Sequence, residues 1–106
     1  MKKLSDEEKN IVNEGLVVID FYGEWCGPCM MLKPTIEKLA DEYKDNGVKI
    51  YGCNIDECPD ITSYFGIRSV PTLMFLNNGE LQNRLIGAHT EQTIKDSINL
   101  LISEST

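Results

Sequence analysis

The sequence lacks a basic segment and a long apolar run. It has 10 lysines and arginines against 17 acidic residues, a net charge of −7, and no basic run longer than Lys2-Lys3. Proteins that bind nucleic acid or anionic membranes normally carry a basic face, so neither partner is expected. No apolar run approaches the ~18 residues of a membrane span, and none follows the N-terminal lysines as in a signal peptide. We therefore expect a cytoplasmic protein.

Internal repeats, low-complexity tracts and linkers are also missing. The chain has 106 residues, 42% of them hydrophobic and 25% charged, which is ordinary for one globular domain. We predict a single domain over residues 1–106, and a monomer. Four cysteines in a reducing compartment are more typical of catalysis or metal binding than of structural disulfides.

Apolar periodicity predicts strands that alternate with helices. Residues 16–22 form a near-continuous apolar run, typical of a strand buried on both faces. The full order of predicted segments is a helix over 5–13, that strand, a helix from the Cys26–Cys29 segment to about 46, a strand over 48–55, a short helix from 59, a hairpin of 72–76 and 81–86, and a helix from 90. The first helix is predicted from a Ser5-x-x-Glu8 capping box and turns Ile11 and Val12 inward. This order favours a mixed sheet covered by helices on both faces.

Cys26 and Cys29 lie where the buried strand ends and the long helix begins. The partial positive charge of a helix N-terminus favours the thiolate, which is the nucleophile in disulfide exchange. Positions i and i+3 share a helix face, so the two sulfurs can form a disulfide. We expect Cys26, at an exposed mouth, to attack and the more buried Cys29 to resolve the mixed disulfide. Gly27 leaves the first sulfur accessible, and Pro28 suits a first helical turn.

The other two cysteines, Cys53 and Cys58, leave alternatives open. C-x-x-C is also zinc-ligand spacing, but the Cys53–Cys58 spacing is atypical of zinc sites, and we expect no metal. Cys53 is interpreted as a small buried apolar residue, and Cys58, before a helix-starting proline, as a candidate reactive thiol. A regulatory disulfide between the two is the other alternative.

The chain resembles the thioredoxin family from about Leu16 to Leu101. The motifs that carry the resemblance are Asp20-Phe21-Tyr22, Glu24 and the Trp25-Cys26-Gly27-Pro28-Cys29 active-site motif, Pro34, Asn54-Ile55-Asp56, Gly66 to Thr72, Asn78-Gly79 and Gly87-Ala88. The resemblance implies a three-layer α/β/α thioredoxin fold with a central mixed sheet of four or five strands. It also implies a thiol–disulfide oxidoreductase that reduces disulfides in cytosolic proteins.

Electron transport in this interpretation needs a partner. The chain has no Gly-rich dinucleotide motif, so the redox-active Cys26–Cys29 disulfide is expected to work without another cofactor. The resemblance implies re-reduction by a flavoprotein thioredoxin reductase. The alternatives are an oxidase or isomerase with the same fold, and a non-enzymatic thioredoxin-like binding subunit.

Asp20 is an ionisable residue in an apolar strand, where burial should raise its pKa and make it a possible proton acceptor. In the thioredoxin family the matching aspartate lies beneath the disulfide and helps deprotonate the buried cysteine. The alternative is a carboxylate at a strand end that water satisfies. The one histidine, His89, is interpreted as a surface residue before the last helix.

The resemblance also implies a substrate-binding surface. It implies that the Val70–Pro71 bond is cis and faces the cysteine pair, which leaves the Val70 backbone free to pair with an extended substrate segment. Trp25 is expected to supply a flat apolar contact, and Gly87 with Ala88 to complete the surface.

Several positions depart from the family pattern. Only four residues precede Ser5, so we predict that the usual N-terminal strand is missing or vestigial and that the sheet has four strands. Tyr22 stands where a second tryptophan is common, Gly52 where a lysine lies near the aspartate, and Met30 where a lysine often follows the second cysteine. Loss of positive charge should keep Asp20 protonated to higher pH and could alter reductase docking.

Overall fold

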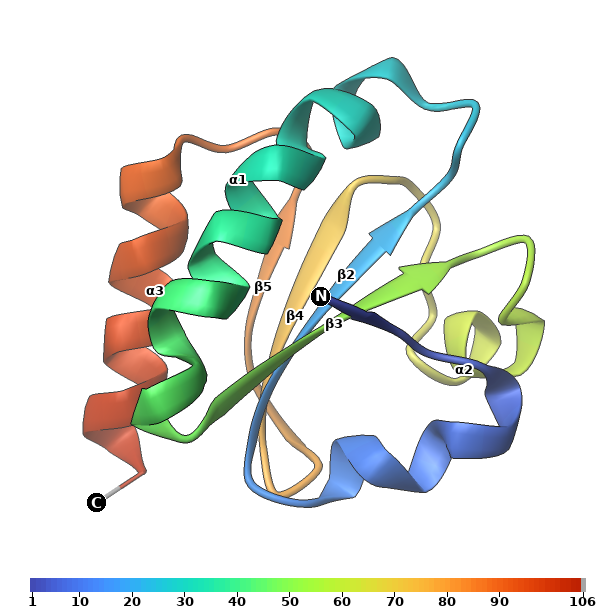
Figure 1. Cartoon of the computed structure of the whole chain (residues 1–106). Helices are drawn as coiled ribbons and strands as arrows, with labels where there is room; N and C mark the ends of the chain where they lie inside the picture. The colour runs from blue at the N-terminus through green and yellow to red at the C-terminus, as the bar shows by residue number, and fades with distance from the viewer. Residues whose placement is uncertain (106) are drawn as a thin grey trace.

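Five strands form one sheet in the order β1-β3-β2-β4-β5 in the computed structural model, which describes residues 1–105. The strands are β1 (Lys2–Lys3), β2 (Leu16–Tyr22), β3 (Val48–Asn54), β4 (Thr72–Asn77) and β5 (Glu80–Ile86). The helices are α1 (Gly27–Tyr43), α2 (Pro59–Tyr64) and α3 (Glu91–Glu104), with 3-10 helices η1 (Asp6–Asn13) and η2 (Lys44–Asn46). Figure 1 shows α1 and α3 on one face of the sheet and η1 and α2 on the other.

Strand β2 lies at the centre of the sheet, as its apolar sequence predicts. It pairs in parallel with β3 and antiparallel with β4, and β4 forms the predicted hairpin with β5. Alternate β2 side chains enter two cores, because successive residues of a strand point to opposite faces. Val18 packs with residues of α1 and α3, whereas Val17 and Ile19 pack with residues of η1 and α2. The mixed sheet and the three-layer arrangement are confirmed.

The prediction of four strands is wrong, because a two-residue strand is present at the N-terminus. Lys2 and Lys3 pair in parallel with Tyr51 and Gly52 of β3, and the Leu4 N–H extends the ladder by donating to the Gly52 carbonyl at 2.7 Å. Both lysine side chains are exposed, so no apolar alternation marks β1 in the sequence. Strand β1 is therefore the short N-terminal strand that we expected to be missing or vestigial, and it is the fifth strand of the sheet.

The N-terminal helix is present but differs from its prediction. It is a 3-10 helix with a non-helical Glu8, and Ser5 makes no side-chain cap. The Ser5 hydroxyl instead donates to the Glu8 carboxylate at 3.3 Å, and that carboxylate also pairs with Lys2 at 2.6 Å. The Ser5 backbone N–H also interacts with the Glu8 carboxylate, so half of the capping box forms, and the half from the Ser5 hydroxyl to the helix N–H groups is missing. Val12 is buried and Ile11 is partly buried, as predicted.

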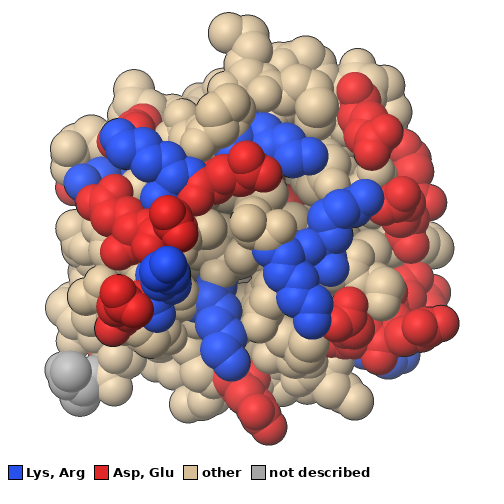
Figure 2. Space-filling model, viewed as in Figure 1, with Lys and Arg blue, Asp and Glu red and all other residues tan. Residues whose placement is uncertain are grey.

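Charged side chains of both signs are interspersed on the surface seen in Figure 2, where blue and red groups lie side by side. This agrees with the absence of a basic run in the sequence. None of the helices within residues 1–105 combines the length and the apolar character that a membrane span requires.

Candidate functional site

Cys26 and Cys29 form a disulfide at the point where the chain leaves β2 and enters α1, with Cα atoms 5.3 Å apart. Cys26 is the N-cap residue of α1, and Pro28 occupies the first helical turn, as predicted. The backbone N–H of Cys29 donates to Cys26 Sγ at 3.2 Å. In the reduced protein the same N–H and the helix N-terminus favour negative charge on Cys26 Sγ.

The two cysteine residues differ in exposure, but less than the sequence suggested. Cys26 is 7% exposed and Cys29 is 1% exposed, so the expectation of an open mouth at Cys26 is corrected to a nearly closed one. Both cysteines pack against Tyr22, with Met30 and Val70 beside them. Gly27 and Pro28, which lie between the two cysteines in sequence, are both exposed.

Strand register brings distant residues to the disulfide. Phe21, at the end of β2, pairs with Thr72, and Thr72 pairs with Ile86. The residues flanking these strands must therefore meet at one end of the sheet, where Cys26 also lies. The Val70–Pro71 bond is cis, as the resemblance implied.

Val70 and Gly87 both lie close to their expected partners at this end of the sheet. The Val70 carbonyl oxygen lies 3.9 Å from Cys26 Sγ. The Gly87 N–H donates to the Pro71 carbonyl at 2.8 Å, and Gly87 has a φ of +87°, a conformation that favours glycine. Gly87 and the exposed Ala88 therefore lie beside the cis proline.

Trp25 presents an apolar surface next to the disulfide and is 68% exposed. Its indole N–H donates to the Asp56 carboxylate at 2.8 Å. A Cβ at Gly23 would lie 2.5 Å from the indole ring, so only glycine lets the ring take this position. The sequence analysis gave neither Gly23 nor Asp56 a role in supporting Trp25. Asp56 is 31 positions away along the chain, so no local pattern links it to the indole.

Asp20 lies in β2 two residues before Tyr22, on the same face of the strand. It is 2% exposed, and burial raises the pKa of its carboxyl from 3.8 to about 7, while the charge of Lys33 acts in the opposite direction. Within residues 1–105, its Oδ1 atom has no hydrogen-bond partner. A buried carboxyl of this kind can exchange a proton near neutral pH.

Lys33 of α1 was not singled out from the sequence. Its Nζ lies 4.8 Å from the centroid of the Tyr22 ring. The available signal was helical spacing, because Lys33 lies four residues after Cys29 and so on the same helix face.

Cys53 and Cys58 are free thiols that lie away from the disulfide, in the core beneath η1 and α2. Both are fully buried, and burial raises the pKa of each. The Cys58 thiol donates to the Leu4 carbonyl at 2.9 Å, and it also interacts with the Cys53 thiol. Within the described chain, no group of three or more histidine, cysteine or acidic side chains could hold a metal ion.

We expect Cys53 and Cys58 to stay reduced when Cys26 and Cys29 are oxidised. A thiol reagent should detect almost no thiol in the folded, oxidised protein, because both groups are buried and little thiolate forms. It should detect two thiols after denaturation and four after reduction. An oxidised, denatured protein without free thiols would contradict this prediction and would indicate a second disulfide.

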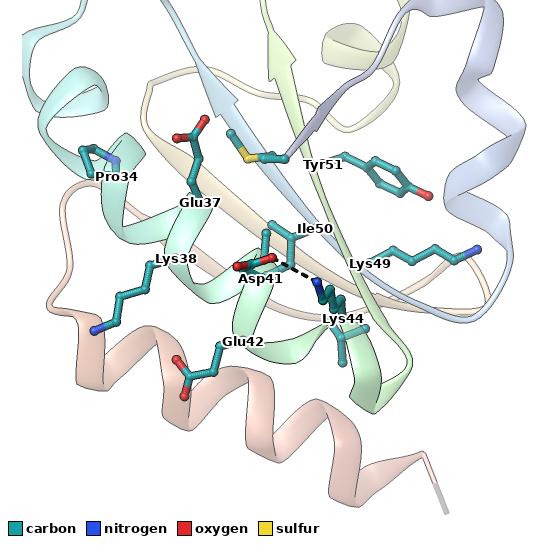
Figure 3. Close-up of a pocket in the computed structure, with 12 residues that line it drawn as sticks. Pro34, Glu37, Lys38, Asp41, Glu42, Lys44, Lys49, Ile50 and Tyr51 are labelled. Carbon is teal, nitrogen blue, oxygen red and sulfur yellow. Dashed lines mark ion pairs between the residues drawn. The ribbon is translucent and has the colours of Figure 1, made fainter.

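His89 and a surface groove beside α1 are not part of the predicted site. His89 Nε2 is 3.1 Å from the Ile86 carbonyl, which agrees with the surface role predicted for it. The groove in Figure 3 runs between α1 and the edge of β3, beside Met1, and is lined by charged side chains such as Glu37 and Lys49. None of the predicted site residues lines this groove.

Comparison with known proteins gives consistent matches. The family model described as Thioredoxin matches residues 2–100. A protein named Thioredoxin from Rickettsia felis is 44% identical over 96 residues, which cover 90% of this chain and 90% of the relative. A protein named Thioredoxin M-type, chloroplastic, from Spinacia oleracea is 42% identical over 87 residues, which cover 82% of this chain but 48% of the relative. The chain thus spans about half of the chloroplastic relative and nearly all of the bacterial one.

Proposed function

Because the chain belongs to the thioredoxin family and is a thiol–disulfide oxidoreductase, we propose that it reduces protein disulfides through Cys26 and Cys29. The observation that carries the proposal is the Cys26–Cys29 disulfide at the N-terminus of α1, facing the cis Val70–Pro71 segment. One domain over residues 1–106 acts as a monomer, and the cysteine pair serves in place of a dissociable cofactor.

The first step is attack by the Cys26 thiolate on a substrate disulfide. A bond forms between Cys26 Sγ and one substrate sulfur, and the other substrate sulfur leaves as a thiolate. The Cys29 N–H, 3.2 Å from Cys26 Sγ, supports this role because it stabilises negative charge on that sulfur. The higher exposure of Cys26 supports the same order of attack.

The second step is attack by Cys29 on the mixed disulfide. Asp20 accepts the Cys29 proton, directly or through a water molecule, and the thiolate displaces the second substrate sulfur from Cys26. The Cys26–Cys29 disulfide is then restored, the substrate has gained two electrons, and its two thiolates take up two protons, one from Asp20 and one from the solvent. The pKa of Asp20 near 7 supports this proton transfer, because the carboxylate and the acid are both available at neutral pH.

The substrate-binding surface surrounds Cys26. Trp25, Gly27 and Pro28 lie on one side, and the loops that contain Val70, Pro71, Gly87 and Ala88 lie on the other. An extended substrate segment would pair with the Val70 backbone, as in strand addition. The small residues at 87 and 88 allow a partner backbone to approach closely.

The reductant is proposed to be a flavoprotein thioredoxin reductase, and the compartment the cytoplasm. The relative from Rickettsia felis supports a bacterial type of system, whereas the relative from Spinacia oleracea is named as chloroplastic. Met30 stands where a lysine often follows the second cysteine, so a positive charge next to the disulfide is missing. This absence affects which reductase surface can dock.

Redox titration tests the direction of electron flow. We expect a standard potential near the value of about −270 mV known for thioredoxins, measured by the fluorescence of the single tryptophan in dithiothreitol buffers. A potential near the value of about −120 mV known for the oxidant DsbA would favour the oxidase or isomerase alternative instead.

Turnover assays with insulin separate the remaining alternatives. The protein should catalyse insulin reduction by NADPH when a flavoprotein thioredoxin reductase is present. If the protein accepts electrons only from a ferredoxin-dependent reductase, that reductase replaces the flavoprotein as the proposed partner. Failure to accelerate insulin reduction even with dithiothreitol would favour the binding-subunit alternative.

A further inference from the structure

Lys33 lies over Tyr22, a residue that contacts both active-site cysteines and shares a strand face with Asp20. Helix α1 places Lys33 one turn after Cys29, and its ammonium lies over the Tyr22 ring at 4.8 Å from the centroid. Tyr22 in turn packs against both active-site cysteines and shares a strand face with Asp20. The charge of Lys33 acts on the Asp20 carboxyl and favours its ionised form.

The two strands next to β2 offer Asp20 no cation. Its direct neighbours are Gly52 on β3 and Leu73 on β4, and neither carries a charge. Gly52 is the position where the resemblance led us to expect a lysine. Met1 and Tyr22 occupy the space there, since a Cβ at Gly52 would lie 3.2 Å from Met1 Cε and 3.3 Å from Tyr22 Cε1.

The other titratable groups in this region do not replace Lys33. Lys3 of β1 acts on the Tyr22 hydroxyl together with Glu24 and Glu57, and Lys3 also pairs with Glu57 at 2.8 Å. The active-site cysteines pack against Tyr22, and a thiolate there would add negative charge, not positive. Lys33 is therefore the group that can favour the carboxylate of Asp20.

We propose that Lys33 is a positioning residue that acts through Asp20. Strand β3 supplies no positive charge next to Asp20, and α1 supplies it instead, from Lys33, one helix turn after Cys29. The inference rests on the proposed function, because it concerns the proton that Cys29 loses in the second step. Lys33 itself does not contact the reacting sulfurs. It raises the fraction of Asp20 that is carboxylate at neutral pH and so the fraction that can accept the Cys29 proton.

The test compares Lys33→Met with Lys33→Arg over pH 5.5–9. Two quantities are measured: the rate of insulin reduction, and the titration of the Asp20 carboxyl carbon by NMR in the reduced protein. With Lys33→Met, both midpoints should move to higher pH, because an opposite charge is removed. The rate at pH 7 should fall several-fold and recover above pH 8.5. Lys33→Arg should keep both midpoints close to those of the wild type.

Two further variants show whether the effect is local and acts through Asp20. Lys38→Met removes a charge from the same helix, but Lys38 pairs with Glu91 at 2.9 Å, so neither midpoint should change. In an Asp20→Asn background, Lys33→Met should no longer shift the rate profile, as expected for coupled residues.

The outcomes separate this inference from the proposed function. If the Asp20 titration of Lys33→Met superimposes on that of the wild type, the inference is wrong, whatever the enzyme activity. If the wild type does not reduce insulin, the proposed function fails, and the NMR titration still decides whether Lys33 controls Asp20. A shift with Lys38→Met equal to that with Lys33→Met would also overturn the inference.

Discussion

Replacing Cys26 with serine is expected to lower the rate of insulin reduction by at least ~10³-fold, the scale on which removal of a nucleophile acts. A serine hydroxyl at this position ionises far less than a thiol and cannot form the mixed disulfide. The Cys29 N–H and the helix N-terminus would still be present, but the atom that they stabilise would be gone. Insulin turbidity with dithiothreitol as the reductant measures the loss.

Cys29→Ser gives the complementary result. Cys26 would keep its N-terminal position on α1 and could still attack, but nothing would displace the substrate. A covalent adduct between the protein and its substrate should accumulate, visible by mass spectrometry and removed by excess dithiothreitol. The same adduct on Cys26→Ser would show that the two roles are reversed.

Cys58→Ala is the matched control for both variants. Cys58 lies in the core beneath η1 and α2, away from the disulfide, so this variant should keep the wild-type rate. Wild-type turnover in Cys26→Ser, or a loss in Cys58→Ala as large as in Cys26→Ser, would contradict the assignment of Cys26 as the nucleophile.

Features set by local sequence were predicted well. Periodicity and turn residues within a few positions determine strand β2, the helix that follows it and the β4–β5 hairpin. The C-x-x-C pair lies at the predicted strand end because neighbours in sequence must be neighbours in space. The family resemblance added the cis Val70–Pro71 bond, which no local pattern indicates.

Features set by tertiary contacts were missed. Strand β1 has only two exposed lysines and exists because its backbone reaches Tyr51 and Gly52. The capping box forms only in part: Lys2 of β1 pairs with the Glu8 carboxylate, and the Ser5 hydroxyl binds that carboxylate instead of the Glu8 N–H. Both segments therefore involve contacts with another element, which the spacing of residues along the chain does not reveal.

The surroundings of Asp20 were predicted in part from local sequence and missed in part because they depend on tertiary contacts. Its place in an apolar strand predicted burial and a raised pKa, and the structure has it 2% exposed with a pKa of about 7. The sequence also indicated the loss of a nearby positive charge at Gly52. It did not indicate that Lys33 approaches from α1, because that approach depends on how the helix packs over Tyr22.

Asp20→Asn is expected to stabilise the oxidised protein by about 3–4 kcal/mol at pH 8 and by little at pH 4. The carboxyl pKa is raised from 3.8 to about 7 in the folded protein, so the unfolded chain loses its proton first as the pH rises. Wild-type stability therefore falls progressively between about pH 4 and pH 7, where only the folded state holds the proton. The uncharged amide removes this dependence.

Denaturant unfolding at pH 4 and pH 8 measures the effect, with Asp45→Asn as an exposed control that should show no such gain. A gain below about 1 kcal/mol at pH 8, or an equal gain at both pH values, would contradict the assignment of Asp20 as a buried acid that titrates near neutrality. The same variant should reduce insulin roughly 10-fold or more slowly at pH 7, since Cys29 loses its proton acceptor. Greater stability with lower activity is the result expected when a buried carboxyl is kept for proton transfer, at a cost to the fold.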